Sequence, residues 1–117
     1  MRNRKFDLED RFVGLAANIA LFCKDFPSDF IGQYYGNQLL RSGGSAALNF
    51  GEAQGATSPK DYIFKASLVL KELKESRVNL RILNRIDYGS DQIKHSLLDE
   101  IEQLVRIIST IIKNKTS

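Results

Sequence analysis

The sequence has few of the residues on which most enzyme and metal sites depend. Its 117 residues include one cysteine, Cys23, one histidine, His95, and no tryptophan. A single thiol excludes an internal disulfide and a cysteine-ligated metal site, and we expect Cys23 to pack in the core because it ends the apolar segment 19–23. His95 has no partner for a metal site or a nucleophilic triad, so we expect it at the surface. The sequence predicts no cofactor and no bound metal.

Long hydrophobic runs are also missing. No segment approaches the roughly 18 to 20 consecutive apolar residues that a membrane span needs. The basic residues 2–5 are followed by Asp7, Glu9 and Asp10 and not by the apolar core of a signal peptide. We therefore expect a cytoplasmic protein that does not bind membranes. The net charge of +3 and the pI near 9.1 permit contact with nucleic acid, but only the placement of the charges can argue for it.

The two prolines, Pro27 and Pro59, stand at predicted helix boundaries. Between these boundaries apolar residues recur at steps of three and four, and no alternating run indicates a strand. The sequence predicts a single all-α domain over residues 1–117, with helices at roughly 7–26, 29–56, 59–88 and 91–113. The predicted apolar stripes are Leu8, Phe12, Leu15, Ile19 and Phe22 in the first helix, Tyr62, Ala66, Val69, Leu73, Leu80 and Leu83 in the third, and Leu97, Ile101, Leu104, Ile108 and Ile111 in the fourth.

The predicted connections are short, which makes consecutive helices antiparallel and gives an up-down-up-down four-helix bundle. Ser28 and Ser58 are the expected caps of the second and third helices, Gly89 suits a left-handed conformation, and Ser90 starts the fourth. The second helix contains five glycines, each costing up to about 1 kcal/mol relative to alanine, so we expect close helix crossings there. These glycines are Gly32, Gly36, Gly43, Gly44 and Gly51.

The segment 38–55, QLLRSGGSAALNFGEAQG, carries a recognisable pattern of small and polar residues. It resembles the signature L-x-R-[SA]-[GA]-x-S-x-x-x-N-x-x-E-[AG] of the bacterial four-helix-bundle proteins encoded by intervening sequences in 23S rRNA genes. The likeness continues into the third helix, through Ser58, Asp61, Lys65, Ala66, Lys71 and Glu72. The chain differs from many members by having Leu40 in place of Arg, Ala47 in place of Pro, and no aromatic residue near Val78 and Asn79.

The resemblance implies a homopentamer, in which five bundles form a ring. The related accessory proteins of diversity-generating retroelements bind nucleic acid and a reverse transcriptase. Since a shared fold does not establish a shared activity, the surface of this chain must itself argue for nucleic-acid binding.

A basic ridge runs along the third helix. At about 100° per residue, its five cations fall within a sector of about 120°. They are Lys71, Lys74, Arg77, Arg81 and Arg85. The last four have no acid three or four positions away, whereas Glu75 can pair with Lys71. The ridge can attract phosphates, above all when a ring multiplies it. The alternative is a solvated face, or arginines that bridge to acids on a neighbouring chain.

The signature residues Arg41, Ser45, Asn49 and Glu52 suggest two roles. They can form a polar site for a ligand or RNA, or a buried asparagine and an Arg–Glu pair can fix register within or between bundles. We favour the register role. Segment 41–45, RSGGS, lacks the G-K-[ST] and the preceding strand of a phosphate loop, so we read its Gly and Ser as helix-crossing residues.

The fourth helix carries a second apolar stripe, Leu98, Val105 and Ile112, beside its main one. Such a wide face fits a broad intramolecular core, but it also fits a subunit contact, and with the family resemblance we expect this stripe at or near the oligomer interface. The acids Asp99, Glu100 and Glu102 share an exposed face without an apolar pocket, so they do not indicate acid catalysis.

The sequence therefore favours a non-enzymatic oligomer that binds RNA or DNA through the basic ridge, as an accessory or scaffold to another protein. The alternative is a structural oligomer with a protein partner and no affinity for nucleic acid.

Overall fold

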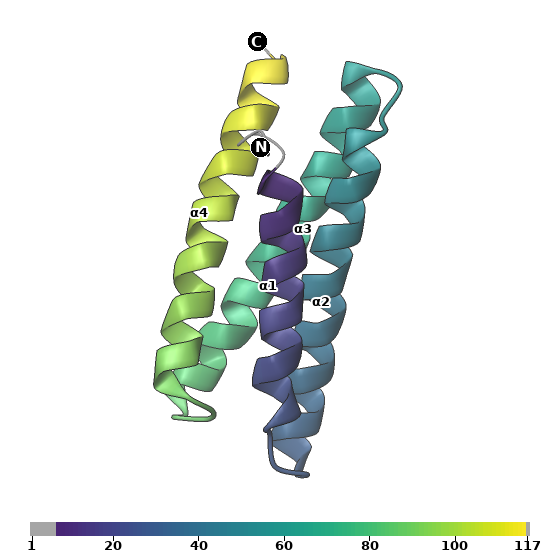
Figure 1. Ribbon diagram of the computed structural model, residues 1–117. Helices are drawn as coiled ribbons and strands as arrows, with labels where there is room; N and C mark the ends of the chain where they lie inside the picture. The colour runs from purple at the N-terminus through teal and green to yellow at the C-terminus, as the bar shows by residue number, and fades with distance from the viewer. Residues whose placement is uncertain (1–6, 117) are drawn as a thin grey trace.

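The protein folds as an antiparallel four-helix bundle, as predicted (Figure 1). The computed structural model describes residues 7–116, and the basic start of the chain lies outside them. The helices are α1 (Asp7–Lys24), α2 (Phe30–Gln54), α3 (Pro59–Arg85) and α4 (Asp91–Thr116). Each helix packs against its neighbours in the chain, and α1 also contacts α4, so their order around the bundle is α1, α2, α3, α4.

The core is built from the predicted apolar stripes. Phe12 of α1 stacks on Phe50 of α2, with 4.7 Å between ring centroids, in the middle of this core. Leu8, Tyr62 and Ile111 lie at its margin and are partly buried. The other predicted stripe residues of α1, α3 and α4 are buried: Phe12, Leu15, Ile19, Phe22, Ala66, Val69, Leu73, Leu80, Leu83, Leu97, Ile101, Leu104 and Ile108. Periodicity alone thus identified the inward face of these three helices.

The helix boundaries differ from the prediction at several ends. The cap of α2 is Asp29 and not Ser28, because Asp29 has the extended backbone and its carboxylate accepts the N–H of Gly32. Ser58 caps α3 as predicted, accepting the N–H of Asp61. The third helix ends at Arg85 instead of residue 88, and the chain then takes positive φ angles at Asp87 (55°) and Gly89 (82°). The fourth helix continues to Thr116, beyond the predicted end at residue 113.

One end of the bundle is fastened by an aromatic cluster and a carboxylate. Phe26, between α1 and α2, packs edge-on against Phe22 and against Tyr88, which lies between α3 and α4. The Tyr88 hydroxyl donates to Asp29 Oδ1 (2.8 Å), the same oxygen that accepts the N–H of Gly32 (2.7 Å). These contacts tie the α1–α2 connection to the α3–α4 connection, which Figure 1 shows at the same end of the molecule.

Two of the five glycines in α2 allow a close approach that a side chain would block. A Cβ atom on Gly32 would lie 2.6 Å from the carbonyl oxygen of Pro27, and one on Gly43 would lie 2.7 Å from Ile19 Cδ1. A Cβ on Gly36 would make ordinary contact with Phe26 at 3.6 Å. Nothing lies within 4 Å of a Cβ on Gly44, and only Glu9 Oε2, at 3.9 Å, approaches one on Gly51. A close helix crossing therefore explains Gly43, whereas Gly32 is confined by the connection that precedes its own helix, and neither reason applies to Gly44 or Gly51.

None of the helices in the described part of the chain is both long enough and apolar enough to cross a membrane.

We expect Gly32→Ala and Gly36→Ala to change stability in opposite directions. The first places a methyl group against a backbone oxygen, so it should lower the free energy of unfolding by about 1–3 kcal/mol. The second fits without a clash and should leave stability unchanged or raise it by up to about 1 kcal/mol through helix propensity. Urea unfolding followed by circular dichroism measures both, and equal effects would contradict this account of Gly32.

We expect the Asp29 carboxylate to make folding dependent on pH. The Gly32 N–H, and then the Tyr88 hydroxyl, lower the pKa of Asp29 in the folded state. Its stabilisation is therefore complete above the unfolded pKa of about 4 and is lost as the pH falls through the folded pKa. Asp29→Asn keeps an accepting oxygen but does not titrate. The difference in melting temperature between wild type and this variant should shrink from pH 6 to pH 2, and a constant difference would be evidence against this role.

Candidate nucleic-acid interface

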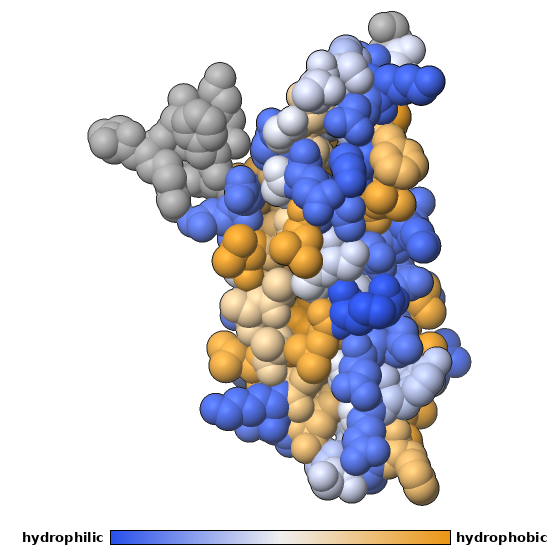
Figure 2. All heavy atoms as spheres, turned by 90° about the vertical axis from the view of Figure 1, so that its right-hand side faces the viewer, coloured by the Kyte–Doolittle hydropathy of each residue, from blue (hydrophilic) through white to orange (hydrophobic). Residues whose placement is uncertain are grey.

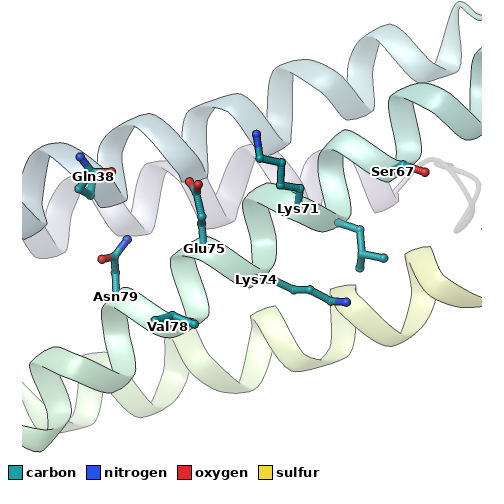
Figure 3. Close-up of a pocket in the computed structure, with 8 residues that line it drawn as sticks. Gln38, Ser67, Lys71, Lys74, Glu75, Val78 and Asn79 are labelled. Carbon is teal, nitrogen blue, oxygen red and sulfur yellow. The ribbon is translucent and has the colours of Figure 1, made fainter.

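The outward face of α3 displays most of the basic ridge to solvent. Its apolar stripe is buried in the core, which turns the charged positions outward between α2 and α4. Lys71, Lys74, Arg81 and Arg85 are exposed, whereas Arg77 is only partly exposed. In Figure 3, Lys74 extends from the ridge on the side of α4, and Lys71 and Glu75 lie on the side of α2. The structure thus brings the predicted ridge together on one surface.

The fourth helix supplies an acid that analysis of α3 alone could not reveal. Arg77 Nη1 donates to Glu102 Oε1 at 2.8 Å, across the α3–α4 contact. This hydrogen bond lowers the pKa of Glu102, and the charges of Arg106 and Arg81 act in the same direction. One carboxylate thus lies among three guanidinium groups, and Arg106, missed by the sequence analysis, extends the basic surface onto α4. Arg77 is primarily a bridge between helices.

Glu75 forms its salt bridge with Arg41 of α2 and not with Lys71. Arg41 donates to both Glu75 and Glu72, with Nη1 at 3.2 Å from Glu72 Oε1. The hydrogen bond from Arg41 lowers the pKa of Glu75, and the charge of Lys71 contributes less. Among the described residues, no hydrogen bond joins Lys71 to an acid of its own helix.

Apolar side chains are interleaved with these cations. Val78, Ile82 and Ile86 are exposed at successive steps of four along α3, and with Arg81 and Arg85 they line a shallow hollow. A second hollow, in Figure 3, is formed by α3 residues around Lys74 with Gln38 of α2. The ridge therefore combines charge for phosphates with apolar area that phosphates do not use.

The signature residues form a polar contact between α2 and α3. Glu72, which is largely buried, accepts hydrogen bonds from Arg41 through Oε1 and from Ser45 Oγ through Oε2 (3.1 Å). Asn49 Nδ2 donates to the carbonyl oxygen of Ser45 (2.9 Å) and also to its hydroxyl. These side chains satisfy one another, which supports the register role and leaves little unpaired polarity for a ligand.

Two further contacts extend this polar contact along the helices. Glu52 pairs with Lys65 of α3 at 2.6 Å. Deeper inside, the hydroxyls of Ser42 and Ser76 are fully buried and lie 2.5 Å apart. The predicted Arg–Glu pairing is therefore intramolecular, but Arg41 pairs with Glu72 and Glu75 and Glu52 pairs with a lysine. Sequence reasoning did not identify Glu72 or Ser76 as the partners of α2, although both lie on the α2 side of the core stripe of α3.

The stripe Leu98, Val105 and Ile112 packs against the core of its own chain. All three side chains are partly buried there. This is the broad intramolecular face that the sequence left open, and the predicted role of the stripe in a subunit contact stays a prediction. The large apolar side chains that are exposed to solvent lie mostly on α1, α2 and α3.

The residues considered for catalysis do not gather into a reactive site. His95 is exposed, and Cys23 is half-buried, with burial raising the pKa of its thiol to about 11. Glu100 accepts hydrogen bonds from Arg11 of α1 (2.6 and 2.9 Å), so this acid fastens α4 to α1. Within the described residues no three His, Cys, Asp or Glu side chains lie close enough to hold a metal ion.

The sequence analysis also missed a buried lysine. Lys94 is fully buried, and its Nζ donates to the carbonyl oxygen of Leu83 (3.2 Å) and lies 3.4 Å from Asp91 Oδ1. A cation is favoured at this place because the last carbonyls of α3 carry the negative end of its dipole. The signal in the sequence was its register, since Lys94 precedes Leu97 and Ile101 on the core face of α4.

Comparisons with known proteins agree with this architecture. The family model described as 23S rRNA-intervening sequence protein matches residues 4–110. A crystal structure of a protein with unknown function from the S23 ribosomal protein family of Bacteroides thetaiotaomicron is similar, with a TM-score of 0.82 and 28% identity. The similarity covers 91% of this chain and 98% of that one. No curated protein matches. Neither the family nor the solved structure is described as an enzyme.

We expect the Ser42–Ser76 pair to behave as one energetic unit. Ser42→Ala leaves the Ser76 hydroxyl buried without this partner, whereas Ser76→Ala leaves the Ser42 hydroxyl only its long contact with the carbonyl oxygen of Leu39 (3.5 Å). Each single change should cost about 1–2 kcal/mol. The double variant removes both polar groups, so its cost should fall short of the sum of the single costs by at least about 0.5 kcal/mol. A double-mutant cycle by urea unfolding measures this coupling, and additive effects would show that the contact contributes nothing.

Proposed function

Because the chain belongs to the 23S rRNA-intervening sequence protein family, we propose that it is a non-enzymatic cytoplasmic oligomer that binds RNA or DNA through the basic ridge. The observation that carries this proposal is the exposure of Lys71, Lys74, Arg81 and Arg85 on one face of α3. Exposed cations gain affinity for a phosphate backbone by releasing its counterions.

Salt bridges to acids of the same chain decide which cations of the ridge can bind phosphates. Arg77 is held by Glu102, so it supports the surface more than it offers a free charge. The charge of Arg106 acts on the same carboxylate and adds to the positive field. We therefore centre the nucleic-acid site on Lys74, Arg81 and Arg85, with Lys71 and Arg106 at its edges. No aromatic side chain interrupts these positions, which favours a backbone-directed, sequence-tolerant contact.

Assembly is the second part of the proposal. A single ridge offers few phosphate contacts, whereas a closed ring of copies presents several ridges to one nucleic-acid chain and gains avidity. The family resemblance implies a homopentamer, which we propose for this chain. The bound nucleic acid would then be held by a scaffold to which a further protein can attach.

The interleaved apolar side chains favour a second candidate function. Val78, Ile82 and Ile86 offer area that a phosphate backbone does not use but that a protein partner would bury. In that case the ridge belongs to a structural oligomer without nucleic-acid affinity, and its cations supply charge complementarity to an acidic protein surface.

Charge reversal on the ridge separates the two functions. We expect Arg81→Glu with Arg85→Glu to lower the affinity for generic RNA and duplex DNA by more than about tenfold near 0.1 M salt. Wild-type affinity should fall steeply as salt rises, by about 0.9 logarithmic units per phosphate contact and per tenfold salt. Fluorescence anisotropy across a salt series measures both.

The matched control is Lys60→Glu with Lys113→Glu, which changes the net charge equally. Both lysines lie at the opposite end of the bundle, at the start of α3 and near the end of α4. The control should retain most of the affinity. No binding by the wild-type protein would favour the protein-interaction function, and equal losses in both variants would contradict the site on α3.

A further inference from the structure

An exposed apolar surface covers the outer side of α1 and α2. Its largest side chains are Leu48 (70% exposed), Leu21 (61%), Val13 (55%) and Leu40 (44%). Small residues lie between them. We call it the α1–α2 apolar surface and define it as Val13, Ala17, Ala20 and Leu21 of α1 with Leu40, Gly44, Ala47 and Leu48 of α2. Figure 2, which views the molecule from the α2 side, shows apolar residues gathered along one flank beside a charged band.

Helical geometry explains why these residues share one surface. On α1, residues 13, 17, 20 and 21 lie opposite the buried positions Phe12, Leu15 and Ile19. On α2, the edge toward α1 is marked by Gly51, whose nearest neighbour is Glu9 of α1, and Gly44 lies two turns earlier on that edge. Because α1 and α2 are adjacent, the two sets of side chains share the outer side of this helix pair. Leu21 lies at its margin, where it also borders a hollow against α4.

The fold of a single chain does not explain why the exposed positions of this surface are apolar or small. The segment 13–21 of α1 contains no charge, although most of its outward positions face solvent. Gly44 costs up to about 1 kcal/mol in a helix, yet nothing of the same chain lies within 4 Å of its missing side chain. Exposed leucines surrounded by small residues are typical of a surface that another helix approaches closely.

We propose that a second copy of this chain covers the α1–α2 apolar surface in the assembled protein. Permanent contacts between identical chains are more apolar than transient contacts, and most soluble oligomers are built from identical chains. The proposal rests on the oligomeric part of the proposed function, and it names the surface through which the copies meet.

The charges around the surface favour this occupant over an anionic one. Among the described residues, the rim carries acid where α1 begins, at Glu9, and base where α1 ends, at Lys24. A nucleic acid or an anionic membrane would meet Glu9 unfavourably and would find no cluster of cations in the described part of the patch. A second copy presents both signs. The position also leaves the ridge free, because α3 lies diagonally across the bundle from α1.

The contrast with the stripe on α4 strengthens the choice. Leu98, Val105 and Ile112 already pack against their own core, so a neighbour would gain little from covering them. Leu48 and Leu21 remain more than half exposed in the single chain, and their burial at about 25 cal/mol per Å² of apolar area would stabilise association.

The experiment is sedimentation equilibrium at micromolar concentration, with circular dichroism to confirm folding. We expect the wild-type protein to have a multiple of the chain mass and Leu21→Glu with Leu48→Glu to have the mass of one chain, with helicity retained. The control, Phe64→Glu with Ile93→Glu, also adds two negative charges at exposed apolar residues, but on α3 and α4 and outside the surface. It should keep the wild-type mass.

A second variant covers the case in which charge reversal prevents folding. Gly44→Leu places its Cβ in open space, with no other part of the described chain outside its own helix within 4 Å, and raises helix propensity. It should still weaken the association at least tenfold by blocking the close approach. Wild-type mass in both variants would overturn the proposed surface and leave assembly intact, whereas a monomeric wild-type protein would overturn both. Loss of oligomer in the control as well would equally count against this surface.

Discussion

The contact between α2 and α3 is the constraint on which the other features depend. A largely buried carboxylate, Glu72, receives hydrogen bonds from Arg41 and Ser45, and the paired hydroxyls of Ser42 and Ser76 lie beneath it. An apolar interface tolerates small slips, whereas shifting these groups by one turn would leave a charge and two hydroxyls buried without partners. The polar contact therefore selects one register, and that register sets which residues of α2 and α3 face outward.

The two proposed surfaces follow from this register and from the order of the helices. Turning the core stripe of α3 inward presents its cations between α2 and α4. Turning the polar side of α2 toward α3 leaves Leu40 and Gly44 on the edge toward α1, and Leu48 faces outward between the two edges. A basic face and an apolar face thus lie on different sides of one bundle, which allows assembly and nucleic-acid binding to proceed without competition.

Patterns within each helix were enough to predict the fold, whereas the side-chain contacts between helices could not be predicted from them. Apolar periodicity predicted all four helices and the buried apolar residues of α1, α3 and α4, because the spacing of apolar residues marks the helix face that packs into the core. The cap of α2 was misplaced by one residue, since Ser28 and Asp29 are both good capping residues and Tyr88, distant in sequence, supports the second. Spacing within α3 showed no acid near Arg77, yet Glu102 neutralises it from α4.

For the signature segment, the sequence predicted a role in helix register but not the partners of its side chains. A role in register could be predicted for Arg41, Ser45, Asn49 and Glu52 because polar residues inside a helix bundle need partners. The partners themselves, Glu72, Glu75 and Lys65, depend on how α2 and α3 are aligned. Lys94 was overlooked for a related reason: its carbonyl partner belongs to the end of another helix, which no side-chain pattern reports.

The fastening of the two connections by Asp29, Tyr88 and Phe26 gives the bundle unequal ends. Separating the hairpin of α1 and α2 from the hairpin of α3 and α4 at this end requires a capped helix, an aromatic stack and a hydrogen-bonded hydroxyl to open together. At the other end, α2 and α3 are joined by a short exposed turn around Ser58. Native-state hydrogen exchange should therefore be graded along the long axis, with amides beside the fastened connections exchanging only through global unfolding and those at the far end through local fraying.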